Sequence, residues 1–487
     1  MPRFSLFAAV LLLAGSAAQG QSPAPLELSE CRISAGPGYP GIEARCGTLT
    51  RPLDPSNPDR GAIDLNIAVV PALSLEPEPD PFVPIAGGPG QSTVYFYGGW
   101  FTAFERIRQA RDILLVDQRG TGDSAPMTCD IDDDIVEGAY SKEQTLQVTA
   151  ECLELLPHDP RFFTTSVAVA DLEAVRQALG YGALNLYGIS YGSRVAQHFA
   201  RRYPDSTRTV IIDGVVPPQL PLGPGIAIES QRAIDRVMER CSEDVACNER
   251  FPNLRDDFAR LREDLAGQSI LLSLPNPVTA RAEEIEFGND QLAAAVRLLL
   301  YNPRTVALLP LLIDEAANGN LGPLAAQFQM VVASLAESLN IGMHNAVVCT
   351  EDAPFIDYAA VDQEALASTY LGPLQLEAIV TMCSVWPAGT LDDNLREPLT
   401  TDKPVLLLSG EADPITPPDY AVMAAVNLSN AWLLTGRNQG HGLATVGCMP
   451  RVISDFVNTL QLEDGTADCL DDAFAMPFFL DYSGPAP

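Results

Sequence analysis

The chain has 487 residues, of which 47% are hydrophobic, so it is long enough for a full α/β core and an inserted domain. Its 63 acidic residues outnumber its 30 basic residues, and the formal charge at pH 7 is −33. This charge argues against nucleic acid and against an anionic membrane as partners, because both bind lysine and arginine.

The first twenty residues have the parts of a signal peptide. Arg3 precedes an apolar run from Leu6 to Ala14, and small residues follow up to Gly20. No cysteine follows the run directly and no later segment is long and apolar enough to span a bilayer, so we expect no membrane anchor. We therefore expect residues 1–20 to be removed and the protein to be exported, soluble, and periplasmic or extracellular.

Residues 21–216 alternate strand-like and helix-like runs, which predicts the first part of an α/β core. Within them, the strand-like residues 82–86 lead into Gly87-Gly88-Pro89-Gly90. Glycines let the backbone approach a substrate closely, although a plain Gly-Pro turn has the same composition. We predict that the Gly88 N–H is one of the two donors of an oxyanion hole.

A second strand-like run, residues 113–116, leads into the segment from Asp117 to Ser124. This segment has no obvious chemical role of its own. Its Arg119 offers a planar guanidinium group, and we predict that this group pairs with a carboxylate and braces the glycine loop.

Residues 185–193 carry the chemistry most directly, because they deliver one hydroxyl into a Gly-x-Ser-x-Gly turn before a helix-like stretch. A serine on a sharp strand-to-helix turn has strained backbone, and glycines at the flanking positions avoid collisions with the neighbouring strand and helix. Small residues also fill ordinary turns, so partners must be found elsewhere in the chain. The pattern predicts a nucleophile elbow with Ser190 as the nucleophile and the Tyr191 N–H as the second oxyanion donor.

The pattern changes after residue 216. Residues 217–221 are proline-rich and read as a linker, after which helical periodicity dominates. We predict a helical cap over residues 217–395 and a second, C-terminal part of the core over residues 396–487. The main predicted cap helices cover residues 230–240, 254–265, 290–301, 305–317 and 321–339.

The catalytic acid is expected after the buried strand predicted at residues 404–410. Asp413 in the turn that follows is the predicted carboxylate, Glu411 is the alternative, and Asp213 at the end of an earlier strand is a third candidate. A lone Asp-Pro pair is usually a turn former, so this prediction depends on its context.

The base is predicted among four histidines. His441 follows the strand-like residues 431–435 and lies in a glycine-flanked loop that can present a ring toward a site; the alternative is a histidine packed at a loop base. In the order serine, acid, histidine, as in an α/β-hydrolase sheet, His441 would take the Ser190 proton and Asp413 would orient the ring. The other three are His158, His198 and His344.

Taken together, these segments resemble the α/β-hydrolase peptidases that include proline iminopeptidases and secreted bacterial tripeptidyl aminopeptidases. The resemblance rests on residues 87–90, residues 117–124, the elbow, and the loops of Asp413 and His441. The family's glycine loop usually begins with a histidine where this chain has Ala86, which leaves the backbone donors intact. The resemblance implies an α/β-hydrolase sheet with helices on both faces and an inserted, mainly helical cap.

These features predict an exported serine exopeptidase that removes residues or short peptides from the free amino terminus of peptides through an acyl-enzyme. No cofactor and no metal is expected. The alternative is a carboxylic ester hydrolase on the same triad, because the elbow does not distinguish an ester from an amide. The intact triad argues against a third possibility, a binding or structural protein on an inactive scaffold. The oligomeric state and the number of residues removed per cut do not follow from the sequence.

An aminopeptidase must also recognise the ammonium group of its substrate, which in a partly dry pocket needs an anionic partner. Residues 347–354 resemble a segment of the tripeptidyl aminopeptidases and contain Glu351 and Asp352. The resemblance makes these two carboxylates our candidates for binding the amine. In the alternative, Asp352 caps a helix or a turn and Glu351 is solvated surface.

Ten cysteines, an even number, in an exported chain predict a disulfide framework. No pair has Cys-x-x-Cys spacing with a histidine placed to complete a set of four ligands, so we discount zinc. Sequence alone does not fix the connectivity, but pairing neighbours gives five bonds. These are Cys31 with Cys46, Cys129 with Cys152, Cys241 with Cys247, Cys349 with Cys383, and Cys448 with Cys469.

Overall fold

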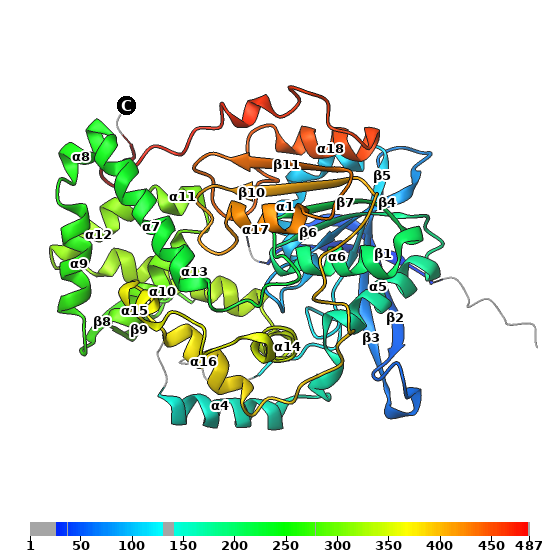
Figure 1. Ribbon diagram of the computed structural model, residues 1–487, viewed down its shortest axis with the longest axis horizontal. Coiled ribbons are helices and arrows are strands. Elements are labelled where there is room, and N and C mark those ends of the chain that lie inside the picture. The colour runs from blue at the N-terminus through cyan, green and yellow to red at the C-terminus, as the bar shows by residue number, and fades with distance from the viewer. Residues whose placement is uncertain (1–25, 37, 130–140, 278, 486–487) are drawn as a thin grey trace, which may run out of the picture.

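The computed structural model describes residues 26–36, 38–129, 141–277 and 279–485, so the predicted signal peptide lies outside the described residues. A sheet with the strand order β1-β2-β3-β5-β4-β6-β7-β10-β11 forms the centre of the core (Figure 1). The pairings of β1 with β2, β2 with β3, and β3 with β5 are antiparallel, and the pairings from β5 to β11 are parallel. The strands are β1 (Ser29–Ile33), β2 (Ile42–Pro52), β3 (Ala62–Val70), β4 (Glu78–Ile85), β5 (Arg111–Val116), β6 (Leu184–Ile189), β7 (Thr207–Asp213), β10 (Val405–Gly410) and β11 (Ala431–Gly436).

Helices cover both faces of this sheet, because successive side chains of each buried strand point to opposite sides. In β10, for example, Leu407 packs into the hydrophobic cluster under one set of helices and Leu406 into the cluster under the other. The predicted α/β-hydrolase architecture is confirmed. The first set is α5 (Thr165–Ala178), α6 (Tyr191–Arg202) and α17 (Pro418–Ala425), and the second is α1 (Thr93–Trp100), α2 (Glu105–Arg108) and α18 (Met449–Thr459).

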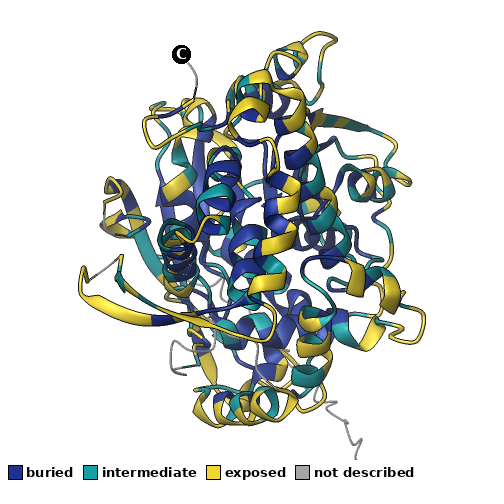
Figure 2. Cartoon of the chain, turned by 90° about the vertical axis from the view of Figure 1, so that its left-hand side faces the viewer, coloured by how far each residue is buried: buried dark blue, intermediate teal, exposed yellow. Residues whose placement is uncertain are grey.

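The middle of the chain forms a group of helices with a hydrophobic cluster of its own. A two-stranded antiparallel sheet, β8 (Ile270–Pro275) and β9 (Ala282–Phe287), accompanies these helices and was not predicted, because its strands are short and mostly exposed (Figure 2). None of the described helices combines the length and the apolar character needed to cross a membrane. The helices between the two core segments are α7 (Ile226–Glu243), α8 (Val245–Arg250), α9 (Leu254–Asp264), α10 (Asn289–Leu299), α11 (Pro303–Val306), α12 (Leu309–Ala317), α13 (Gly322–Ser338), α14 (Ile341–Val347), α15 (Gln363–Ser368) and α16 (Leu374–Cys383).

Each of the two parts, cap and core, also contributes side chains to the hydrophobic cluster of the other. Met343 of α14 and Cys349, in the π-helical turn Val348–Asp352, pack into a hydrophobic cluster of the sheet. In the opposite direction, Phe478 packs into the cap cluster, where the guanidinium of Arg240 lies 4.1 Å from its ring centroid. The boundaries at residues 217 and 395 stay a prediction, since side chains from both parts of the chain pack on each side of them.

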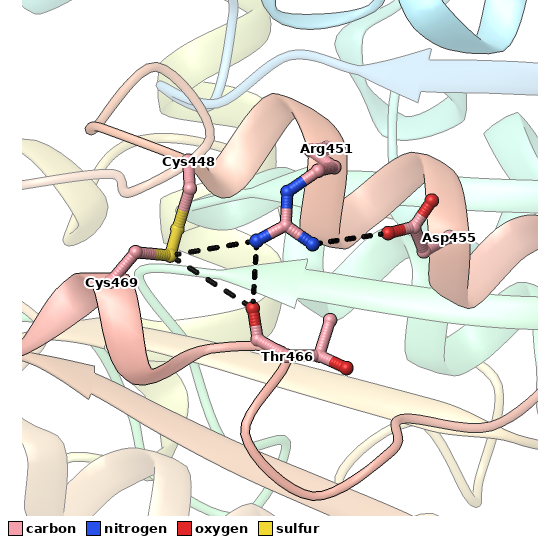
Figure 3. The surroundings of a disulfide bond; sticks show 5 residues. All are labelled: Cys448, Arg451, Asp455, Thr466 and Cys469. Atoms are coloured by element: carbon pink, nitrogen blue, oxygen red, sulfur yellow. Dashed lines mark hydrogen bonds and ion pairs between the residues drawn. A yellow bond between two sulfur atoms is a disulfide. The ribbon is translucent and has the colours of Figure 1, made fainter.

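All five predicted disulfides are present, so the pairing of sequence neighbours is confirmed. The bond between Cys448 and Cys469 joins the start of α18 to the C-terminal segment (Figure 3). Beside it, Arg451 donates to the Thr466 carbonyl at 3.1 Å and lies 3.4 Å from Asp455. This bond fixes one end of the C-terminal segment, whose later residues reach the cap. The disulfide between Cys129 and Cys152 involves the helix α4 (Lys142–Leu155), which carries Cys152.

Candidate active site

The turn between β6 and α6 has the geometry that its sequence predicts. Ser190 has a φ of +56°, in the left-handed region that non-glycine residues rarely adopt. A Cβ added at Gly188 would overlap the Gly192 carbonyl oxygen, and one added at Gly192 would overlap the Ile85 carbonyl oxygen. Both flanking positions therefore exclude any larger residue, and the strained turn holds the Ser190 side chain at the end of the strand.

The glycine loop after β4 lies directly over this serine. A Cβ at Gly87 would lie 2.9 Å from the Ser190 Cβ, and Gly88 has a φ of +104°, which favours glycine. Tyr191 is the first residue of α6, so its N–H has no acceptor within the helix. Gly88 thus follows a residue that lies against Ser190, and Tyr191 follows Ser190 itself, so both predicted oxyanion donors belong to segments at the nucleophile.

The cap contacts the glycine loop through the junction of α13 and α14. Asn340 donates its N–H to the Gly90 carbonyl at 2.9 Å, and its side-chain oxygen accepts the Gly122 N–H at 3.0 Å. His344 Nδ1 lies 3.0 Å from the Pro89 carbonyl oxygen. The backbone of the predicted oxyanion loop is therefore held from the cap side, which the sequence did not indicate.

The core holds the same loop through Asp117. This buried carboxylate accepts the Ser92 hydroxyl at 2.7 Å and the Val94 N–H at 3.1 Å, at the start of the helix that follows the loop. Arg119 pairs with a carboxylate as predicted, at 2.7 Å from Asp171. Its other donors reach the Leu53 and Phe162 carbonyl oxygens, so among the described hydrogen bonds Asp117, and not Arg119, contacts the start of the helix that follows the loop.

The predicted acid and base meet at the loops after β10 and β11. Asp413 Oδ2 lies 2.8 Å from His441 Nδ1 and accepts the Thr416 hydroxyl at 2.7 Å. Asp413 Oδ1 accepts the N–H groups of Ile415 and Thr416, both at 2.9 Å. Since a carboxylate only accepts, His441 Nδ1 carries the proton and Nε2 is free to take one. Thr416 was not predicted, although its spacing of three residues from Asp413 is typical of a local side-chain turn.

His441 lies beside the elbow. A Cβ at Gly214, which follows β7, would lie 2.8 Å from the His441 Cε1, and a Cβ at Gly442 would lie 2.9 Å from the Ile189 Cδ1. Burial has the largest single influence on the pKa of His441 and lowers it, but the charge of Asp413, its hydrogen bond and the charge of Asp213 together raise this pKa above its usual value. The ring is thus well suited to accept a proton at the end of β6.

The two alternative acids have other partners. Glu411 accepts the Asn438 N–H at 3.1 Å and lies 3.2 Å from Arg236 of the cap, at a cleft of about 470 Å³ between α7 and the loop after β10. Asp213 accepts the Tyr187 hydroxyl at 2.8 Å and two N–H groups of the loop after His441. Neither carboxylate reaches the imidazole, so Asp413 is the one that can orient it.

The carboxylates of Glu351 and Asp352 are both completely buried, at the π-helical turn. Arg194 of α6 binds both oxygens of Asp352, at 2.8 and 3.1 Å, and lies 3.8 Å from Glu351. Glu351 accepts the N–H and the hydroxyl of Thr165, and this hydroxyl lies 2.6 Å from the Tyr191 hydroxyl. Neither residue is solvated surface, and the cluster lies next to the residue that follows the nucleophile.

The cap also contacts the base itself. Tyr301, just after α10, accepts the His441 N–H at its carbonyl oxygen at 2.9 Å, and the two rings pack edge to face at 5.1 Å. The Tyr301 hydroxyl accepts a bond from Arg297 at 3.2 Å. No signal in the sequence singled out this tyrosine, because a helix-terminal aromatic residue is usually part of a core.

Two of the other histidines, His198 and His158, have partners outside the proposed triad. His198 is fully buried on α6, 2.8 Å from Asp392, and burial lowers its pKa to about 4. His158 stacks on Phe163 at 5.9 Å. Of the four histidines in the chain, only His441 has a carboxylate partner next to the elbow.

Comparison with known proteins supports the same architecture. A family model described as "alpha/beta hydrolase fold" matches residues 80–239, and one described as "TAP-like protein" matches residues 368–469. The tripeptidyl aminopeptidase of Streptomyces coelicolor is 26% identical over 87% of this chain and 81% of its own length. The serine protease Hip1 of Mycobacterium tuberculosis is 32% identical over 40% of each chain, and a proline iminopeptidase of Neisseria meningitidis is 26% identical over 29% of this chain and 34% of its own. The predicted resemblance is confirmed: the protein is an α/β hydrolase similar to the tripeptidyl aminopeptidases.

Proposed function

We propose that the protein is an exported serine exopeptidase that removes residues or short peptides from the free amino terminus of peptides. Ser190 attacks the scissile carbonyl, His441 takes the serine proton and passes it to the leaving amine, and Asp413 orients the imidazole. The N–H groups of Gly88 and Tyr191 stabilise the oxyanion. A water molecule, activated by His441, then hydrolyses the acyl-enzyme.

The observation that carries this proposal is the pairing of Asp413 with His441 beside the strained turn at Ser190. An imidazole held through Nδ1 by a buried carboxylate has a fixed tautomer, and this tautomer leaves Nε2 as the base. The chemistry is acyl transfer, for which the core supplies every group.

The carboxylates next to the elbow are the proposed partners of the substrate amine. Glu351 and Asp352 share this site with two guanidinium groups: Arg194 binds Asp352, and Arg396 donates to the backbone carbonyl of Glu351 at 2.8 Å. Asp352 is fully engaged by Arg194 and the Leu222 N–H, whereas among the described residues only Thr165 hydrogen bonds the Glu351 carboxylate. We therefore assign the amine preference to the cluster, with Glu351 as the carboxylate whose charge is least compensated.

Export is supported by the five disulfides, which persist in oxidising compartments. The alternative substrate class is a carboxylic ester, since the same triad and oxyanion donors would serve it. We favour the peptide, because the Glu351 carboxylate can attract an ammonium group and offers nothing to a neutral ester.

The test uses matched substrates with the wild type and Ser190→Ala: mono-, di- and tripeptide anilides with a free amine, their N-acylated forms, and a short-chain aryl ester. We expect cleavage only of a free-amine peptide, and a loss of about 10³-fold or more in Ser190→Ala. Glu351→Gln should raise KM for the free-amine peptide. Turnover of the ester without cleavage of any anilide would overturn the peptidase proposal.

A further inference from the structure

Asp213 is a buried carboxylate that the proposed mechanism does not use. It ends β7, next to the strand that carries the nucleophile, and its side chain is inaccessible to solvent. Four donor contacts converge on this carboxylate. They come from the Tyr187 hydroxyl at 2.8 Å, the Leu443 N–H at 2.8 and 2.9 Å, and the Ala444 N–H at 3.0 Å.

Two of the three donor groups, the N–H groups of Leu443 and Ala444, belong to the loop that carries the base. We define the histidine loop as residues 437–448, between β11 and α18. Leu443 and Ala444 lie two and three residues after His441 and are themselves fully buried. A buried N–H without an acceptor costs about 1 to 3 kcal/mol. The hydrogen bonds from these two N–H groups therefore hold the histidine loop against the Asp213 carboxylate.

The backbone of the same residue contacts the nucleophile. The Asp213 carbonyl oxygen accepts the Ser190 N–H at 2.9 Å. The next residue, Gly214, lies against the imidazole of His441, with room for no Cβ. One short segment at the end of β7 therefore touches the serine through its backbone and the histidine loop through its side chain.

We propose that Asp213 is a positioning residue that sets the distance between Ser190 and His441 by bonding the histidine loop to the end of the strand beside the nucleophile. The inference rests on the proposed triad. Asp413 fixes the rotation and tautomer of the imidazole, whereas Asp213 fixes where the loop places it. Asp213 makes no contact with the reacting atoms.

The charge of Asp213 also acts on the base. Burial raises the pKa of Asp213 to about 6, although the Leu443 and Ala444 N–H groups, the Tyr187 hydroxyl and the nearby His441 each oppose this rise. Its negative charge contributes, after that of Asp413, to the raised pKa of His441. The titratable groups facing Asp213 are thus Tyr187 and His441.

These contacts give two variants that should shift the pH profile in the same direction by different amounts. Asp213→Asn keeps the shape but removes the charge and one acceptor, so the His441 pKa falls and the acidic limb of kcat/KM moves to lower pH. Tyr187→Phe removes a donor that favours the ionised carboxylate, so Asp213 protonates at a higher pH, loses part of its charge beside His441, and moves the acidic limb to lower pH by a smaller amount. Tyr187→Phe is nearly isosteric and serves if Asp213→Asn does not fold.

The experiment measures kcat per active site, titrated with a fluorophosphonate, and the pH profile on whichever matched substrate the wild type cleaves. We expect Asp213→Asn to lower kcat about 10- to 100-fold, with KM changed less than about threefold. Asp80→Asn is the matched control: Asp80 is a buried carboxylate at the opposite end of the sheet, 3.0 Å from Arg111. It should lose stability but keep kcat.

The outcomes separate this inference from the proposed function. If Ser190→Ala is inactive while Asp213→Asn and Tyr187→Phe both keep the wild-type kcat and acidic limb, Asp213 has no positioning role and the triad stands. If Ser190→Ala keeps its activity, the triad itself fails. A loss of folded protein in Asp213→Asn with a normal limb in Tyr187→Phe also overturns the inference.

Discussion

The core and the cap contribute to the site in different ways. The core groups, Ser190, Asp413 and His441, all follow the carboxyl ends of parallel strands of one sheet, β6, β10 and β11. The cap groups, among them Tyr301, Asn340 and Glu351, lie at helix ends and in irregular turns. Strand order alone brings the core groups to one edge of the sheet, whereas the cap groups arrive there only through tertiary packing.

This difference assigns chemistry to the core and placement to the cap. The cap supplies a carbonyl and a ring to His441, two contacts to the backbone of the glycine loop, and the Glu351 carboxylate behind Tyr191. Changes in core groups should therefore abolish the reaction, and changes in cap groups should weaken it or alter its substrate preference.

The largest effect is expected for the acid. Asp413→Asn keeps the shape of the side chain but allows the wrong imidazole tautomer, and kcat should fall about 10⁴-fold. Glu411→Gln is the control, since Glu411 contacts Arg236 and the Asn438 N–H instead of the imidazole, and its kcat should stay within about threefold of wild type. Equal losses in both variants, measured by steady-state kinetics, would assign the orienting role to neither residue alone.

Gly214→Ala should cost about 100-fold in kcat. Its φ of +57° strains any side chain, and a Cβ would lie 2.8 Å from the His441 ring, so the base must move. Gly267→Ala is the matched control, because Gly267 has a φ of +72° but no atom within 4 Å of the added Cβ. It should lower the melting temperature without changing kcat. A Gly214→Ala enzyme with normal kcat would show that the ring position is not critical.

Loss of the cap contact to His441 should lower kcat less than Asp413→Asn or Gly214→Ala does. Tyr301→Leu removes the ring that packs on His441 but keeps the carbonyl that accepts its N–H, so kcat should fall about tenfold. Tyr301→Phe removes only the bond from Arg297 and should stay near wild type. If Tyr301→Leu instead lowers kcat as much as Asp413→Asn does, the cap takes part in the chemistry and the core does not supply it alone.

The sequence predicted the core more completely than the cap for a physical reason. The elbow, the glycine loop and the turn of Asp413 are local patterns whose residue types follow from backbone strain and strand ends, so each could be recognised in isolation. The burial of Glu351 and its proximity to Thr165 depend on how the π-helical turn packs against α5 and α6. No local pattern encodes such a contact, and the role of Tyr301 was missed for the same reason. The hairpin β8–β9 was missed because its strands are short and mostly exposed.

The KM for a free-amine peptide should change a few fold with pH if Glu351, in the cluster behind Tyr191, attracts the amine. Burial raises the pKa of Glu351 to about 7. Below that pH the carboxyl is neutral, and above it the carboxylate attracts an ammonium, so KM for a free-amine peptide should fall about three- to tenfold between about pH 6 and about pH 8. In Glu351→Gln this KM should be high and independent of pH. The same pH slope in that variant would place the titrating group elsewhere.

The smallest effects concern two disulfides. Cys241 and Cys247 are 6 residues apart, at the ends of two cap helices away from the proposed chemistry, and replacing both with serine should cost about 2 kcal/mol of stability with no change in kcat or KM. Cys349 and Cys383 are 34 residues apart, and their bond joins α16 to the turn that carries Glu351. Their removal should cost about 4 kcal/mol and should also raise KM for free-amine peptides. Chemical denaturation and kinetics at one temperature measure both quantities. Because the two bonds differ in what they hold in place, an equal KM in both double variants would mean that the position of Glu351 does not matter for substrate binding.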